Sequence, residues 1–158
     1  MAVFFDTHAH LDYPDFAPEI EQVIARAQAA GIAKIISIGT DLASSARAIK
    51  LAESHAGIYA VVGWHPSHVL EAPDDIRPAL RELGQHPKVV AFGETGLDFF
   101  RTGDDGFPAQ FRAFEAHIAL AKKHDIAMQI HDREAHDAVL ETLARVGAPD
   151  KTVFHCFS

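Results

Sequence analysis

The stretch Val89-Val90-Ala91-Phe92-Gly93-Glu94 has the form of a buried β-strand that ends on a carboxylate. Other apolar runs along the chain also end on a residue type that binds metal, and these residues are His8 and His10, His65, His131 and His155. Helical stretches separate the runs, and such alternation is typical of a parallel sheet. Parallel strands bring their carboxyl ends to one rim, where β/α barrels build their active sites. The pattern therefore predicts a barrel with metal-binding side chains along its rim.

The strand–helix unit repeats along the whole chain. Apolar residues at helical spacing, from Ile20 to Ala27, mark the first helix, and Gly31 stands where a C-terminal cap belongs. We expect strands near residues 3–8, 34–38, 58–62, 89–92, 127–130 and 152–155, joined by helices over 18–30, 41–55, 76–83, 108–124 and 135–146. The strands are almost continuously apolar, as they are when helices cover the sheet and side chains fill its inside.

The number of strands predicts only part of a barrel. A TIM-type (β/α) barrel has eight parallel strands and typically about 250 residues, whereas this sequence of 158 residues stops at its sixth strand. We therefore expect an α/β fold in which residues 1–158 form a single, partial β/α barrel hydrolase domain with six of the eight βα units. The outer strands would then have unpaired edges and uncovered apolar surface, so we expect self-association or reduced stability.

The composition of the chain limits which partners it can bind and which cellular compartment it suits. The formal net charge of −8 argues against broad electrostatic binding to nucleic acid. It does not exclude a nuclease, because metal ions can be the largest local charges where phosphates bind. The N-terminus lacks a secretory signal, and no apolar run approaches the roughly 20 residues of a membrane span. The single cysteine, Cys156, excludes an internal disulfide and fits a reducing compartment. We expect a cytoplasmic protein that does not enter a membrane, with Cys156 buried and inert.

The rim residues suit a site for one or two divalent metal ions. His8 and His10 lie two apart at a strand end, so both imidazoles project to the same side. Glu94 offers two oxygens and can bridge two cations, while His131 and His155 can complete a second site. Metals about 3.5–4 Å apart can activate a water and stabilise the leaving oxygen of a phosphodiester. Histidine-rich sites admit Zn, Mn or Co, whereas Mg favours more oxygen ligands.

At these residues the chain resembles the TatD family of metal-dependent deoxyribonucleases, within the amidohydrolase-like barrels. The motifs that carry the resemblance run from one end of the chain to the other: Asp6-Thr7-His8-Ala9-His10-Leu11-Asp12, Gly63-Trp64-His65-Pro66, Gly93-Glu94-Thr95-Gly96-Leu97-Asp98-Phe99-Phe100, Ile130-His131-Asp132-Arg133 and His155-Cys156-Phe157-Ser158. The segments around Glu94 and after His155 are the most specific.

The resemblance implies a metal-dependent nuclease that acts on DNA, from its ends. No obligate protein partner is evident in the sequence. It implies that His8 and His10 bind one metal, that Glu94 bridges, and that His131 and His155 bind the other. The metal would be Mg, Mn, Zn or Co. The family's last ligand, an aspartate after the eighth strand that positions or deprotonates the attacking water, has no counterpart in this sequence. We therefore expect the 158-residue chain alone to be a poor catalyst.

Two other functions stay open at this point. The same ligand set would serve a metal-dependent hydrolase of amide or ester bonds, such as an aminoacyl ester, since carbonyl carbon and phosphorus are attacked alike. The chain could also be a truncated relative that binds metal and catalyses weakly or not at all. Release of nucleotides from DNA, compared with hydrolysis of ester and amide substrates, distinguishes these functions.

Several residues near the motifs have two interpretations. His65 can bind a substrate phosphate or orient a ligand, or make a structural hydrogen bond, and Arg133 can bind a phosphate or form a surface ion pair. Asp98 can orient a ligand histidine or cap the loop, and Trp64 is expected to pack rather than to stack on a base. We expect the remaining histidines to be surface or capping residues: His55, His68, His86, His117, His124 and His136.

Overall fold

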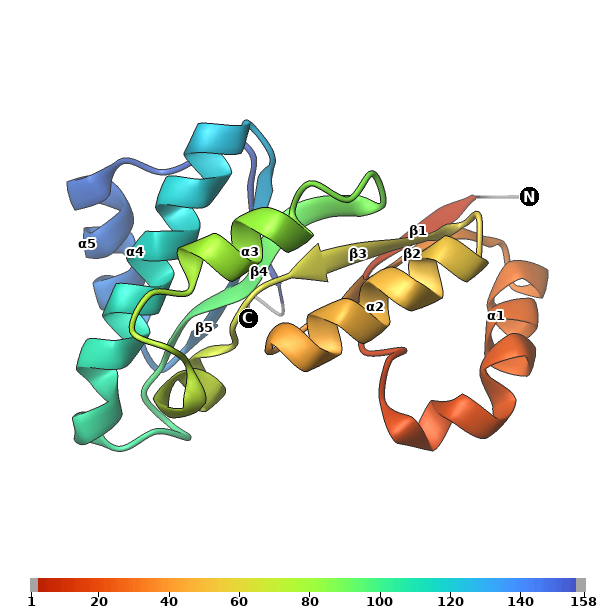
Figure 1. Cartoon of the computed structure of the whole chain (residues 1–158), viewed down its shortest axis with the longest axis horizontal. Coiled ribbons are helices and arrows are strands. Elements are labelled where there is room, and N and C mark those ends of the chain that lie inside the picture. The colour runs from red at the N-terminus through yellow and green to blue at the C-terminus, as the bar shows by residue number, and fades with distance from the viewer. Residues whose placement is uncertain (1–2, 156–158) are drawn as a thin grey trace.

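Six parallel strands, hydrogen-bonded in sequence order, form the sheet of this protein (Figure 1). The computed structural model describes residues 3–155, so the expectation for Cys156 lies outside the described residues. The strands are β1 (Phe4–Ala9), β2 (Ile32–Ile38), β3 (Ile58–Val62), β4 (Val89–Asp98), β5 (Ala127–Arg133) and β6 (Thr152–Phe154). The predicted α/β fold, six units of a β/α barrel with parallel strands, is confirmed.

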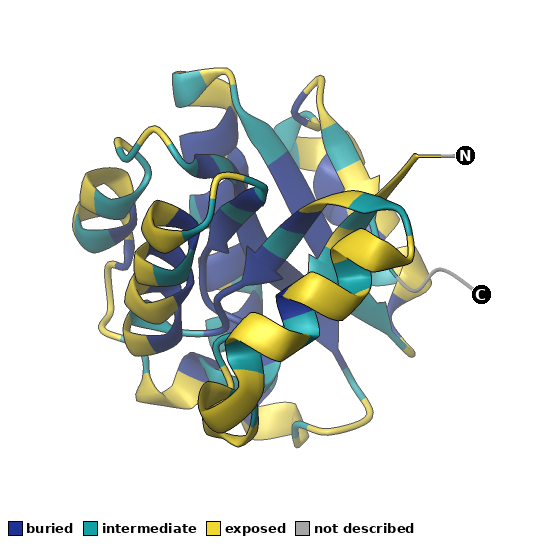
Figure 2. Ribbon diagram, turned by 90° about the vertical axis from the view of Figure 1, so that its right-hand side faces the viewer, coloured by how far each residue is buried: buried dark blue, intermediate teal, exposed yellow. Residues whose placement is uncertain are grey.

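Helices follow each of the first five strands and cover one face of the sheet (Figure 2). They are α1 (Ile20–Ala29), α2 (Leu42–Ser54), α3 (Arg77–Leu83), α4 (Phe107–His124) and α5 (His136–Val146), with 3₁₀ turns η1 (Pro14–Glu19), η2 (Pro66–Glu71) and η3 (Asp104–Gly106). Asp41 begins α2 as its N-cap, because its Oδ1 accepts a hydrogen bond of 2.6 Å from the Ser44 N–H. No helix among residues 3–155 is long and apolar enough to cross a membrane; the cytoplasmic compartment stays a prediction.

The apolar core has two parts, one on each face of the sheet. The larger cluster joins strand residues such as Phe92 to helix residues such as Phe114 and Leu80. A smaller cluster contains strand residues only, centred on Ile38 and Val61, which places it on the face that the helices leave uncovered. Burial of large side chains on both faces fixes the position of each strand, and so of the residue at its end.

Strand β4 is longer than the sequence pattern predicts. The prediction ended this strand at Phe92, before the glycine, whereas β4 continues to Asp98. Thr95 to Asp98 pair in parallel with Ile130 to Arg133 of β5, after a register shift between Phe92 and Thr95. Gly93 therefore permits an irregularity within the strand and does not end it. As a result, Glu94 lies inside a strand, held by pairing on both sides of the shift.

His117 is fully buried, which corrects the expectation that the helical histidines are surface or capping residues. Its Nε2 accepts a hydrogen bond of 3.1 Å from the Trp64 backbone N–H, and its Nδ1 lies 2.6 Å from the Ala113 carbonyl oxygen. Because one ring nitrogen accepts, the imidazole is neutral, and burial lowers the pKa of His117 to about 4. The other histidines of that group, which lie in helices or connections, are at least partly exposed, and His86 pairs with Glu53 at 3.1 Å.

The buried His117 should make stability depend on pH. In the unfolded chain this imidazole titrates near its ordinary pKa of 6.5, whereas the folded form resists protonation down to about pH 4. Between these values the unfolded state binds more protons, so the free energy of unfolding falls as the pH falls. Comparing pH 7.5 with pH 5, we expect His117 to contribute a loss of about 2 kcal/mol.

Urea unfolding of the wild type and of His117→Gln at the two pH values measures this contribution. The glutamine keeps an acceptor for the Trp64 N–H but cannot be protonated, so its stability should vary less with pH. His86→Gln, which alters an exposed histidine, should keep the wild-type dependence. Equal pH dependence in wild type and His117→Gln would contradict the assignment.

Candidate functional site

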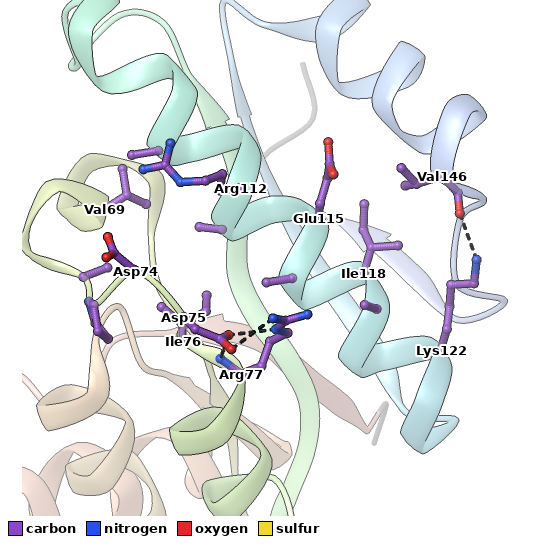
Figure 3. A pocket seen from close by; sticks show the side chains of 16 residues that line it. Val69, Asp74, Asp75, Ile76, Arg77, Arg112, Glu115, Ile118, Lys122 and Val146 are labelled. Carbon is purple, nitrogen blue, oxygen red and sulfur yellow. Dashed lines mark hydrogen bonds and ion pairs between the residues drawn. The ribbon is translucent and has the colours of Figure 1, made fainter.

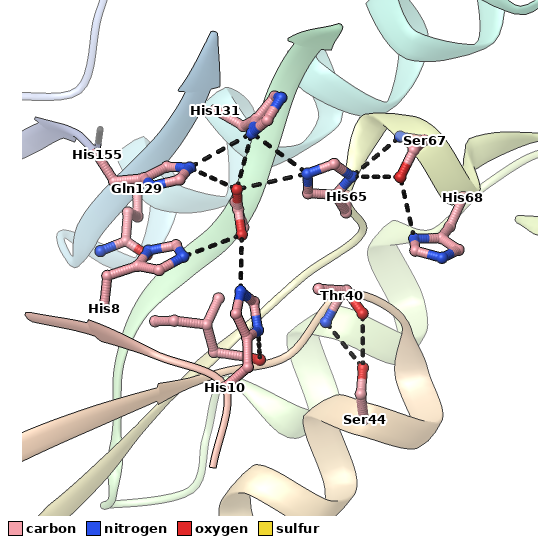
Figure 4. Close-up of polar contacts among 12 residues, drawn as sticks. His8, His10, Thr40, Ser44, His65, Ser67, His68, Gln129, His131 and His155 are labelled. Carbon is pink, nitrogen blue, oxygen red and sulfur yellow. Dashed lines mark hydrogen bonds and ion pairs between the residues drawn. The ribbon is translucent and has the colours of Figure 1, made fainter. Parts of the chain in front are cut away.

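Glu94 is a buried carboxylate on which five histidines converge (Figure 4). Only 2% of the residue is exposed. Its Oε1 atom faces three of the imidazoles, at 2.5 Å from His155 Nε2, 2.9 Å from His131 Nδ1 and 3.4 Å from His65 Nε2. These side chains come from the ends of β3, β5 and β6, so neighbouring strands deliver them to one point.

The Oε2 atom of Glu94 faces the two histidines of the His-x-His pair. It lies 3.3 Å from His8 Nε2 and 3.7 Å from His10 Nε2. The two oxygens thus divide the histidines as the bridging arrangement predicts, with His8 and His10 on one side. His155 adjoins both sides, because its ring also stacks on that of His8 with centroids 3.9 Å apart. The structure therefore brings together every rim residue that the sequence singled out.

Two glycines next to Glu94 allow β4 and β5 to approach closely. Gly93 has φ +143° and Gly96 has φ +139°, a region that favours glycine. A Cβ atom at Gly93 would lie 2.5 Å from the Gln129 carbonyl oxygen, and one at Gly96 would lie 2.0 Å from that of His131. No side chain fits at either position. The glycines of this motif are therefore required to place Glu94 beside the end of β5.

Burial and hydrogen bonding shift the pKa values of Glu94, His131 and His65 in opposite directions. Burial alone would raise the pKa of Glu94, but hydrogen bonds from the histidines outweigh it and hold that pKa below its usual range. Burial would lower the pKa of His131, and the Glu94 and Asp98 carboxylates raise it instead. For His65 burial prevails over the contact with Glu94, so its pKa is lowered. Glu94 is therefore ionised, and His65 is neutral at neutral pH.

Hydrogen bonds on the far side of the rings orient the histidines. Asp98 Oδ2 accepts a hydrogen bond of 3.0 Å from His131 Nε2, and its Oδ1 accepts from the backbone N–H groups of Phe100 and Arg101. Asp98 thus makes both kinds of contact that the sequence left open. The Ile38 carbonyl oxygen lies 3.2 Å from His10 Nδ1. Metal-binding histidines are commonly held in this way, by a carboxylate or carbonyl on the other nitrogen.

Gln129 orients His8 and was missed in the sequence. Its Oε1 lies 2.9 Å from His8 Nδ1, and its Nε2 donates a hydrogen bond of 2.9 Å to the Thr7 carbonyl oxygen. The residue is buried, so both amide bonds are made away from solvent. A single amide within the otherwise apolar run from Ala127 to Ile130 was the one feature that could have indicated this role.

The donor set fits divalent metal. Ligand atoms of His8, Glu94 and His155 lie within 4.8 Å of one another, and the same holds for His65, Glu94 and His131. Imidazole nitrogens together with a carboxylate are the usual ligands of transition metals in hydrolases. These are candidate metal-binding groups, and their chemistry does not select one metal.

A pocket of about 460 Å³ opens above the histidines. Tyr13, Arg101 and Arg133 contribute to its lining. The Arg133 guanidinium lies 4.0 Å from the centre of the Phe100 ring and forms no ion pair within residues 3–155, so the surface ion pair is not observed. Trp64 is buried, and its indole N–H donates to the His68 carbonyl oxygen at 2.8 Å, as expected for a packing role.

A larger pocket, of about 630 Å³, lies apart from the rim (Figure 3). It is bounded by α4 and by the segment that joins η2 to α3. Charged groups in it are largely satisfied by near neighbours, as Asp75 is by Arg77 at 2.7 Å and Lys122 by the Val146 carbonyl oxygen at 2.9 Å. None of the histidines around Glu94 lines it, so the smaller pocket is the candidate site.

Removing the Gln129 amide should weaken metal binding. Gln129→Met keeps the volume of the side chain but loses both hydrogen bonds, so His8 is no longer held toward Glu94. Loss of a residue that orients a metal ligand typically costs about 10- to 100-fold in metal affinity. Titration of the metal-free protein with Zn²⁺ or Mn²⁺, in competition with a chromogenic chelator, measures the change.

Thr142→Val provides the control, since it removes a buried hydrogen bond of α5, from Thr142 Oγ1 to the Ala138 carbonyl oxygen, away from the site. This variant should bind metal as the wild type does. Equal metal affinity of Gln129→Met and the wild type would show that the amide has no orienting role.

Comparison with known proteins places the chain in a family. Residues 5–158 match the family model of TatD-related DNases. The chain is 36% identical to YabD of Bacillus subtilis (strain 168), named an uncharacterized metal-dependent hydrolase, over 99% of this chain and 61% of the relative. It is 39% identical to the 3'-5' ssDNA/RNA exonuclease TatD of Pantoea ananatis (strain LMG 20103), over 98% of this chain and 60% of the relative.

The solved structures agree with the sequence relatives. The crystal structure of YjjV, a TatD homolog from Escherichia coli K12, superposes with a TM-score of 0.90 at 37% identity, covering 98% of this chain and 60% of that one. The chain thus spans about 60% of the length of the relatives it matches. On the family model, the relatives and the shared fold together, this chain belongs to the TatD family of metal-dependent hydrolases.

Proposed function

We propose that this chain provides the metal-binding rim of a nuclease that hydrolyses phosphodiester bonds of DNA, acting from strand ends through a metal-activated water. The observation that carries the proposal is the convergence of five imidazoles on the buried carboxylate of Glu94. A relative with 39% identity is named a 3'-5' ssDNA/RNA exonuclease, which supports nucleic acid as the substrate class.

In this proposal the histidines hold the metal and Glu94 bridges. His8 and His10 approach one oxygen of Glu94, and His131 and His155 approach the other. Divalent ions held there would activate a water and stabilise the charge that develops on a phosphodiester. Because Glu94 is ionised and buried, its negative charge is available on both sides without competition from solvent.

Side chains at the mouth of the pocket would bind the nucleic acid. Arg133 and Arg101 line the pocket and suit a phosphate, which the planar guanidinium binds through paired hydrogen bonds. Tyr13 and Phe100 are exposed aromatic residues, and Tyr13 stacks on His10 with centroids 5.1 Å apart. Bases of a single strand stack on such rings without sequence preference. An unpaired strand therefore suits this mouth.

Nuclease activity should depend on divalent metal and on the bridging carboxylate. Glu94→Gln keeps the shape of the side chain but removes its charge, so activity should fall by about a thousandfold or more, as for other residues that act as a unit. The assay follows nucleotides that the protein releases from single-stranded DNA. Addition of EDTA should abolish the release.

Glu115→Gln is the matched control, because Glu115 lies on α4 and pairs with Arg145, away from the site. It should retain full activity. Activity that survives thorough chelation would refute the metal mechanism. Hydrolysis of ester or amide substrates without release of nucleotides from DNA would show that the protein is a hydrolase of ester or amide bonds and not a nuclease.

Exposed apolar surface at the edge of the sheet should cause self-association. Phe4 and Phe5 of β1 are 59% and 61% exposed, and Val153 of β6 is 46% exposed. Within the described residues β1 pairs only with β2, and β6 only with β5. Open strand edges with apolar side chains favour pairing with another chain. We expect residues 1–158 to associate through this surface.

Light scattering after size-exclusion chromatography tests the association. The double substitution Phe4→Lys and Phe5→Lys should shift the protein toward the monomer, by about tenfold or more in dissociation constant. Leu140→Lys, which changes an exposed apolar residue of α5, should leave the association unchanged. A wild type that is monomeric at high concentration would contradict the expectation.

A further inference from the structure

The histidines around Glu94 differ in which ring nitrogen carries the proton. A neutral imidazole has one N–H and one lone pair, and only the lone pair can bind a metal. The partner on the far side of each ring decides which nitrogen is protonated. Each far-side contact therefore shows whether the nitrogen that faces Glu94 is a ligand or a hydrogen-bond donor.

Two of the rings have a far-side partner that can only accept. The Asp98 carboxylate accepts from His131 Nε2 at 3.0 Å, so it is Nδ1, toward Glu94, that offers a lone pair when the ring is neutral. The Ile38 carbonyl oxygen accepts from His10 Nδ1 at 3.2 Å, so the lone pair of His10 is on Nε2. Both residues can therefore give up the inner proton and offer that nitrogen to a metal ion, as a metal ligand must, while the outer N–H stays hydrogen-bonded.

Gln129 fixes which ring nitrogen of His8 carries the proton. The Thr7 carbonyl oxygen can only accept, so the atom of Gln129 that faces it at 2.9 Å is the NH₂ group. The amide oxygen then faces His8 Nδ1, which must carry a proton to donate to it at 2.9 Å. In the neutral ring the lone pair of His8 is therefore on Nε2, the atom that lies 3.3 Å from Glu94.

His65 is arranged in the opposite way. Its Nδ1 accepts a hydrogen bond of 3.1 Å from the backbone N–H of Ser67, a group that can only donate, so Nδ1 carries the lone pair, and the Ser67 hydroxyl at 2.7 Å then donates to the same nitrogen. The proton of the neutral ring is then on Nε2. That atom lies 3.4 Å from Glu94 Oε1, an acceptor, and 3.3 Å from His131 Nδ1. The same contact makes His65 the N-cap of η2, so the backbone of this turn holds the ring in place.

We propose that His65 is not a metal ligand and that its Nε2–H donates a hydrogen bond to a phosphoryl oxygen of the substrate. The contact with a phosphoryl oxygen is inferred from position, because His65 lines the same pocket as Arg133, the residue proposed to bind a phosphate. Distance alone would group His65 with Glu94 and His131 as ligands, but the Ser67 N–H excludes a lone pair on the inner nitrogen. The hydrogen bond to the substrate rests on the proposed nuclease function, whereas the position of the proton on His65 does not.

The proton is located directly by long-range ¹H–¹⁵N NMR of the metal-free protein, which distinguishes a proton on Nδ1, a proton on Nε2 and a doubly protonated ring. We expect His65 to carry its proton on Nε2, and His8 and His10 to carry theirs on Nδ1. Because this measurement uses the wild type, it does not depend on the folding of a variant or on any activity. A proton on Nδ1 of His65 would overturn the proposal.

Variants separate metal binding from phosphate binding. In His65→Ala the number of bound Mn²⁺ ions and their affinity should stay within about threefold of the wild type, whereas His131→Ala should lose metal. The affinity of the Mn²⁺-loaded protein for inorganic phosphate should fall about 10- to 100-fold in His65→Ala, as expected for loss of a hydrogen bond to a charged group. His65→Gln, whose amide N–H can reach the position of Nε2, should recover part of it. His86→Ala should match the wild type in both measurements.

Loss of metal from His65→Ala comparable to that from His131→Ala would overturn the proposal and make His65 a ligand. Unchanged phosphate affinity in His65→Ala would also overturn it. A wild type that binds phosphate and metal as expected but releases no nucleotides from DNA would refute the proposed nuclease and leave His65 a donor to phosphate. The two failures are thus distinguishable.

Discussion

A carboxylate taken out of water must be surrounded by groups that stabilise its charge, and the arrangement of this rim follows from that requirement. Glu94 is 2% exposed and lies within 3.7 Å of a nitrogen from each of five histidines. The histidines must come from several strands, because no single strand can place five rings around one point. A curled parallel sheet meets the requirement, since its strand ends share a rim.

The strands, their order and the residues that converge on Glu94 could be predicted, because each is encoded locally. An apolar run marks a strand, and the residue that follows it is placed at the rim by the fold. The length of β4 could not be predicted in the same way. In the sequence, Gly93 predicts the end of the strand. The structure shows that the strand continues, because Gly93 lies close to Gln129 of β5 and the residues after it pair with β5.

Contacts between distant segments account for the remaining differences. His117 looks like any other helical histidine, and its burial depends on α4 packing where the Trp64 N–H needs an acceptor. Gln129 stands out in an apolar run, but its partners lie in β1, more than a hundred residues earlier. The orientation of His65 likewise comes from a turn that begins just after it. Each of these roles requires knowledge of which segments meet.

The Gln129 amide also bears on when the rim can form during synthesis. It joins β5 to β1 across 121 and 122 positions in the sequence, and His155 follows later still. Contacts of such separation are made late, because the intervening chain must first be ordered. While the ribosome is still producing β5, the first strand of the nascent chain has helices and neighbours but no partner for His8. The rim thus forms only after β5 and His155 have been made, and an ion that binds only the assembled rim would stabilise the fold over the earlier intermediates.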